Sequence, residues 1–78
     1  MAQYKYRDSL VQSSSTVFDT RHAPGTTPQN PGIYRCPGCA DEVTVPKGRQ
    51  LPPRDHHQHT PSQGKIEWQL LVFAESRK

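Results

Sequence analysis

The clearest alternation of apolar and polar positions lies in the last quarter of the chain, over Lys65–Phe73. Apolar side chains occupy every second position there, namely Ile66, Trp68, Leu70 and Val72. A two-residue period is typical of a β-strand with one buried face. Leu71 and Phe73 interrupt the polar side, so we expect both faces of this strand to be covered near its end.

Two shorter segments, Ile33–Arg35 and Glu42–Val45, flank the sequence Cys-Pro-Gly-Cys. Their β-branched and aromatic residues favour strands, and the four residues between them suit a tight reversal. Pro37 presets a turn, and we expect Gly38 to adopt the positive φ that such reversals commonly need. The pattern therefore predicts a hairpin with two cysteines in its turn.

The chain divides into four segments. We expect residues 1–14 to be a flexible tail and residues 15–31 to hold a short strand over Thr16–Phe18 and a Pro/Gly-rich loop, with His22 exposed. Residues 32–74 form the folded domain, and residues 75–78 are a C-terminal tail. The predicted fold class is small and mainly β, with three to four short antiparallel strands and a disordered N-terminal tail.

Composition limits how such a fold can be stabilised. Only 31% of the 78 residues are hydrophobic, and the mean hydropathy is −0.92. A chain of this size with so small a core usually needs a metal, a disulfide framework or a partner subunit. Tyr34 and Trp68 are the candidate core aromatics. The sequence therefore favours a small stapled module and excludes a large-pocket enzyme fold.

The cysteine count and the hydropathy pattern bear on the compartment. Two cysteines are too few for the disulfide framework of a small secreted domain. No apolar run approaches the roughly 18 residues that span a bilayer, and no apolar signal segment follows the N-terminus. We therefore expect a cytoplasmic protein with no membrane contact, in which two nearby thiols bind a metal or undergo redox chemistry.

The candidate metal ligands are Cys36, Cys39, His56, His57 and His59. They follow the pattern C-x2-C-x16-H-x2-H, with His57 inside the second pair. Zinc favours four ligands drawn from cysteine and histidine in pairs separated by a loop of about this length. Two thiolates and two neutral imidazoles would balance the charge of the ion. The cofactor predicted from these residues is therefore Zn2+.

Spacing leaves the choice of histidines open. His56 and His59 best match the separation of the two cysteines, whereas on an extended backbone His57 and His59 would point to the same side. We favour His56 and His59. Asp55 is a candidate acceptor for the second N–H of a ligating imidazole, which such histidines commonly require.

The stretch Gly-Ile-Tyr-Arg-Cys-Pro-Gly-Cys-Ala-Asp-Glu-Val resembles the first knuckle of small bacterial zinc-ribbon, rubredoxin-like proteins. The later Leu-Pro-Pro-Arg-Asp-His-His-Gln-His and the Trp-bearing strand resemble the second knuckle and the closing strand, so the likeness covers about residues 31–73. It implies Cys36 and Cys39 as ligands directly. It implies His56 and His59 by substitution, because the second knuckle of such ribbons is usually C-x2-C.

These features predict a structural zinc module that acts as a small protein-interaction or adaptor domain and is not an enzyme. One alternative is a nucleic-acid-binding zinc ribbon, although the net charge of +3 is spread along the chain without a basic cluster. The other is a thiol–disulfide redox protein using Cys36 and Cys39, which would need a helix after the first cysteine, where the sequence favours a strand.

Overall fold

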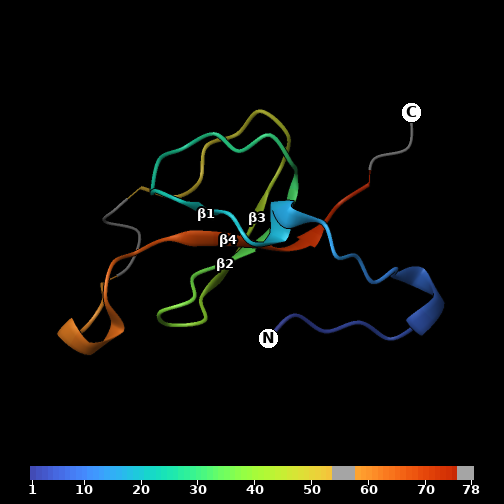
Figure 1. Ribbon diagram of the computed structural model, residues 1–78, viewed down its shortest axis with the longest axis horizontal. Coiled ribbons are helices and arrows are strands. Elements are labelled where there is room, and N and C mark those ends of the chain that lie inside the picture. Colours follow the sequence, from blue (N-terminus) through green and yellow to red (C-terminus); the bar gives the residue numbers. More distant parts are fainter. Residues whose placement is uncertain (54–57, 76–78) are drawn as a thin grey trace.

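Four antiparallel strands in the order β1-β4-β2-β3 form the framework of the protein, as the computed structural model shows (Figure 1). The structure describes residues 1–53 and 58–75. The strands are β1 (Arg21–His22), β2 (Gly32–Arg35), β3 (Glu42–Val45) and β4 (Trp68–Phe73). In these ranges the helical elements are short 3-10 turns: η1 (Arg7–Ser9), η2 (Thr16–Phe18) and η4 (Pro61–Gln63). The predicted fold class, small and mainly β, is confirmed.

The predicted hairpin is present as β2 and β3, paired antiparallel from Gly32 opposite Val45 to Arg35 opposite Glu42. On its other side β2 pairs with β4. An irregularity between Ile33 and Tyr34 shifts the register, so that Ile33 faces Val72 and Tyr34 faces Leu70. A bulge of this kind adds a residue to one strand and bends it.

Strand β4 begins later than its apolar pattern predicts. Its first residue, Trp68, pairs with His22 of β1, and Gln69 pairs with Arg21. Residues 65–67 lie before this point and have no strand opposite them, so their alternation does not produce sheet structure. Strand β1 itself, only two polar residues long, has no sequence signal. The prediction that His22 is an exposed loop residue is wrong, because this half-buried ring packs edge-on against Tyr34.

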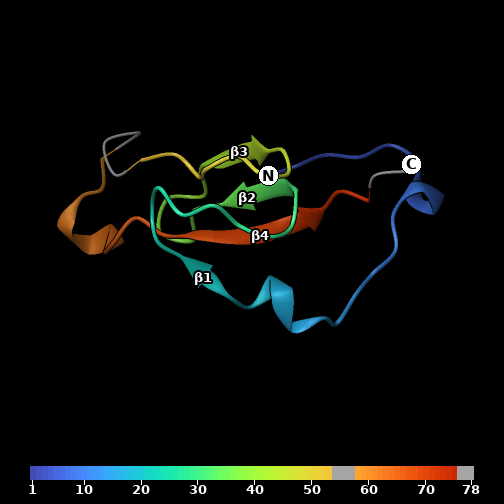
Figure 2. The ribbon, with the colours of Figure 1, turned by 90° about the horizontal axis from the view of Figure 1, so that it is seen from above.

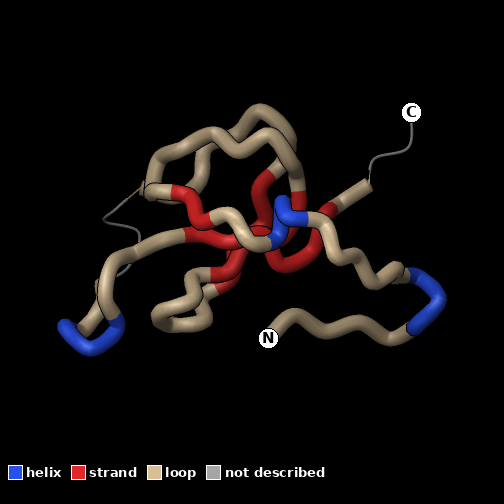
Figure 3. Tube along the Cα trace, in the orientation of Figure 1, coloured by secondary structure: helices blue, strands red, loops and turns tan. Residues whose placement is uncertain are grey.

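The core lies on one face of the sheet. Its fully buried side chains are Tyr34, Cys36, Val45, Leu51, Trp68 and Leu70. Two loops cover this face and bond to each other, through Leu51 N–H to the Thr26 carbonyl (2.8 Å) and Gly25 N–H to the Pro52 carbonyl (3.1 Å). In Figure 3 these loops arch over the strands, which gather at the centre of the molecule. The prediction of Tyr34 and Trp68 as core residues is confirmed.

Two further predictions are corrected by the structure. Thr16–Phe18 is the 3-10 turn η2 rather than a strand, since the Ser15 side chain caps it by accepting the Val17 N–H. The turn η2 still contributes to the core, because the Phe18 side chain packs against the buried residues. The Phe18 carbonyl also accepts a hydrogen bond from the Gln69 side chain. The end of β4 is covered on one face only: Leu71 is 36% exposed and Phe73 is 43% exposed.

The N-terminal segment lies apart from the core, and residues 1–16 are all exposed. In Figure 2 this segment starts beside the β3 edge, passes through η1 and runs round to η2 on the β1 side of the sheet. The division of the chain into tails and domain stays a prediction. Over the described part of the chain, no helix has the length and apolar character that crossing a membrane requires.

Candidate metal centre

The β2–β3 turn places both cysteines at one end of the core. Cys36 N–H donates to the Asp41 carbonyl (2.8 Å), and Ala40 N–H donates to the Cys36 carbonyl (2.7 Å). The reversal is completed by Ala40, with φ of 67°, and not by Gly38, so the prediction of a positive φ at Gly38 is wrong. Cys36 is fully buried, Cys39 is half-buried, and both are thiols.

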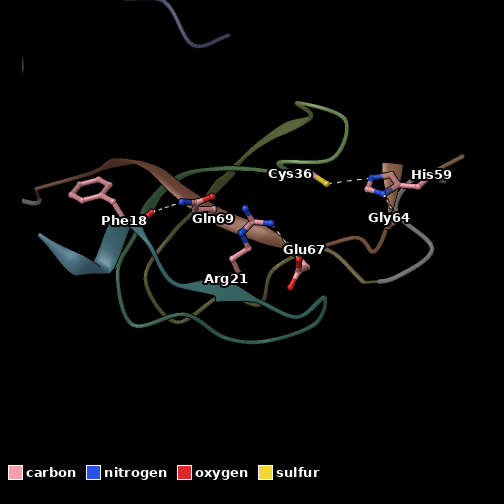
Figure 4. A network of polar contacts seen from close by, with 7 residues as sticks. All are labelled: Phe18, Arg21, Cys36, His59, Gly64, Glu67 and Gln69. Carbon is pink, nitrogen blue, oxygen red and sulfur yellow. Dashed lines mark hydrogen bonds and ion pairs between the residues drawn. The ribbon is translucent and has the colours of Figure 1, made fainter. Parts of the chain in front are cut away.

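His59 reaches this turn from a segment twenty residues further along the chain. Its Nε2 lies 3.3 Å from the Cys36 sulfur and 3.3 Å from the Cys39 sulfur. Its Nδ1 lies 2.9 Å from the Gly64 carbonyl oxygen (Figure 4). A carbonyl oxygen only accepts, so this hydrogen bond assigns the ring proton to Nδ1 and leaves the Nε2 lone pair facing both sulfurs.

These dimensions fit a metal ion. The ligand atoms of Cys36, Cys39 and His59 all lie within 4.8 Å of one another. A sulfur about 2.3 Å and a nitrogen about 2.0 Å from a tetrahedral zinc ion are about 3.5 Å apart. The two sulfur–nitrogen distances of 3.3 Å are close to that value. Two thiols and an imidazole that converge on one point therefore form a group able to bind a metal.

Gly38 allows the histidine segment to approach the cysteine turn. A Cβ at this position would lie 2.5 Å from the Gln63 carbonyl oxygen and 2.9 Å from Cε1 of His59. Glycine is therefore needed here for close approach rather than for an unusual φ. The residues Thr60 and Gln63 form a reciprocal capping box that fixes η4, the turn that follows His59. This T-x-x-Q signal was available in the sequence, whereas the contact with Gly64 was not.

The remaining predicted ligands, His56 and His57, lie outside the described residues, as does Asp55. Of the histidines proposed from spacing, the structure thus brings His59 to the cysteines. The acceptor for its second ring nitrogen is the Gly64 carbonyl.

The protonation of the site follows from its burial. Burial raises the pKa of the Cys39 thiol above its usual 9.0; a hydrogen bond from the backbone of Asp41 lowers it, and the adjacent Cys36 raises it further. In the absence of a cation, Cys39 is therefore protonated at neutral pH. A metal must displace that proton, because the thiolate is the ligand.

The fold and the site define a small mainly-β protein with a cysteine–cysteine–histidine group able to bind a metal. Among curated proteins, Protein L of Escherichia coli is 39% identical over 67 residues, which cover 86% of this chain and 76% of the relative. The chain belongs to the same family as Protein L. Because 67 matched residues leave at most 11 of the 78 residues at either end unmatched, the match includes residues 12–67, and hence both cysteines and His59. No family model and no solved structure matches the chain.

Proposed function

We propose that this protein is a structural zinc module in which Cys36, Cys39 and His59 hold the ion. The observation that supports this assignment best is the orientation of His59, whose Nε2 is 3.3 Å from both sulfurs while its Nδ1 is bonded to Gly64. Sulfur and imidazole ligands suit zinc, whereas an iron site of the rubredoxin type takes four thiolates. His56 or His57 supplies the fourth ligand.

The module acts as a small protein-interaction domain rather than as an enzyme. Four protein ligands would close the site and leave no position for a catalytic water. Thiol–disulfide catalysis is disfavoured because the residues after Cys39 lead directly into β3, and no helix is there to lower a thiol pKa. The exposed apolar side chain of Phe73, at the end of β4, supports a protein partner. The basic residues are spread along the chain without a cluster, which does not favour a nucleic-acid site.

Elemental analysis of the purified full chain tests the metal assignment. We expect one zinc per chain, reduced several-fold by Cys39→Ser and by His59→Gln. The matched control is His22→Gln, because His22 is half-buried against Tyr34 and lies outside the metal group. It should retain full zinc content. Absence of stoichiometric zinc from a well-folded wild-type protein would contradict the proposal.

The fourth ligand is identified by the same measurement on His56→Gln and His57→Gln. One of the two should lose zinc affinity and the other should not. Retention on nucleic acid that weakens steeply with salt would favour the alternative of a nucleic-acid-binding ribbon.

A further inference from the structure

The face of the sheet opposite the core carries a cavity that the metal centre does not use. It has a volume of about 420 Å³ and is lined by Ile33 of β2, Leu71 and Val72 of β4, and the N-terminal segment, including Tyr4 and Leu10. Sites for small molecules typically measure about 300–1,000 Å³ and are mostly apolar. In Figure 1 the N-terminal segment runs on the side of the sheet away from the two loops that cover the core.

Two polar atoms of the residues that line this cavity, Nε of Arg35 and Oε2 of Glu42, are buried without a hydrogen-bond partner. Arg35 lines the cavity from β2. No acidic oxygen of the described residues lies within 4.0 Å of its guanidinium. A buried donor left unsatisfied is costly, and the planar guanidinium matches a carboxylate through two parallel hydrogen bonds.

The carboxylate of Glu42, which lines the same cavity, lies beside a second cationic group. Glu42 faces Arg35 across the β2–β3 pair and also lines the cavity. Its Oε2 lies 3.4 Å from the α-ammonium group of Met1. The groups that line the cavity thus carry two positive charges, on Arg35 and on the Met1 ammonium, and one negative charge, on Glu42, so the complementary ligand group is an anion.

We propose that this cavity binds a small amphipathic monocarboxylate, with the carboxylate on Arg35 and an aliphatic body against Ile33, Leu71 and Val72. The cavity volume of about 420 Å³ lies in the range of small-molecule sites, and decanoate is a suitable probe of this class. The inference is independent of the metal centre, because none of its residues is a proposed zinc ligand.

Titration of the zinc-loaded full chain with decanoate, followed by amide chemical shifts, tests the proposal. We expect saturable shifts at Ile33, Arg35 and Val72. Decanol has the same aliphatic body without the charge and should bind at least about tenfold more weakly, since a hydrogen bond to a charged group is worth more than a tenfold difference. Equal binding of decanol and decanoate, or no saturable shift with decanoate, would overturn the proposal.

Two variants localise the site. Arg35→Gln should weaken decanoate binding at least about tenfold, to the level of decanol. The matched control is Arg21→Gln, which removes an exposed arginine paired with Glu67 and should leave binding unchanged. Leu71→Ser should also weaken binding by removing part of the apolar wall. Trp68 emission checks the fold of each variant. If folded Arg35→Gln or folded Leu71→Ser binds decanoate as tightly as the wild type, the proposed site is refuted. If both variants misfold, the comparison of decanoate with decanol on the wild-type protein tests the proposal instead.

Discussion

Replacement of Gly38 by alanine should release zinc by moving His59, although Gly38 is not a ligand. The added Cβ would lie 2.5 Å from the Gln63 carbonyl oxygen and 2.9 Å from Cε1 of His59. Contacts become ordinary at 3.4 Å, so the backbone of η4 would have to retreat by about 0.9 Å. His59 is covalently tied to this turn and hydrogen-bonded to Gly64 just beyond it.

The expected magnitude follows from the tolerance of metal sites. Zinc–ligand distances are held within about 0.2 Å, and loss of a residue that positions a ligand typically costs about 10- to 100-fold in metal affinity. A displacement of about 0.9 Å exceeds that tolerance several times. We therefore expect Gly38→Ala to weaken zinc binding by about 10- to 100-fold, measured by competition with a chromophoric chelator at constant pH.

The control separates positioning from general destabilisation. Gly48 has φ of +83° and no atom within 4 Å of an added Cβ, so Gly48→Ala strains the backbone by about 1–2 kcal/mol without touching the site. Gly48→Ala should lower the free energy of unfolding and retain near-native zinc affinity. If Gly38→Ala binds zinc as tightly as the wild type, close approach at Gly38 does not position His59, and the reasoning fails.

Three further predictions concern stability and linkage. Removal of zinc with a chelator should reduce the β signal in circular dichroism and shift Trp68 emission to longer wavelength, because so small a core is marginal without its metal; an unchanged spectrum would contradict a structural role. Leu51→Ala should cost about 2–5 kcal/mol in urea unfolding of the zinc-loaded protein, since Leu51 is 1% exposed; a loss below about 1 kcal/mol would contradict its place in the core. Because burial keeps the pKa of Cys39 above 9.0, its thiol gives up a proton to the metal at neutral pH, so zinc affinity should rise about tenfold or more per pH unit between about pH 6 and 8. A flat profile in the competition assay would contradict thiolate ligation.

The β2–β3 hairpin was predictable because all of its determinants are local. β-Branched and aromatic residues flank the cysteine unit, and the chain reverses within it. The alternation in β4 likewise identified Trp68 and Leu70 as buried. Its start was not predictable, since a strand exists only where another strand pairs with it. The partner β1 is a dipeptide, Arg21–His22, without apolar periodicity.

The group able to bind a metal was predictable in its cysteines and only partly in its histidines. Symmetry of spacing favoured His56 together with His59, but the orientation of His59 is set by contacts that spacing does not encode. These are the Gly64 carbonyl at Nδ1 and the close passage of η4 over Gly38. The same limit explains the error at the hairpin turn. The sequence predicts a positive φ at Gly38, but in the structure Ala40 has the positive φ, of 67°, and Gly38 is needed because it has no side chain.

Cys36 connects the two parts of this molecule that stabilise it. It is one of the six buried core residues and also one of the sulfurs that face Nε2 of His59. A thiolate so deeply buried is strongly unfavourable without a cation, so in the proposed zinc module the ion would have to bind as the core is completed. The ion would also tie the hairpin to a segment twenty residues beyond Cys39. Closing a loop of that length with a covalent cross-link is worth about 3 kcal/mol in chain entropy. That contribution is comparable to the burial of one or two large apolar side chains in addition to those that this small core already holds.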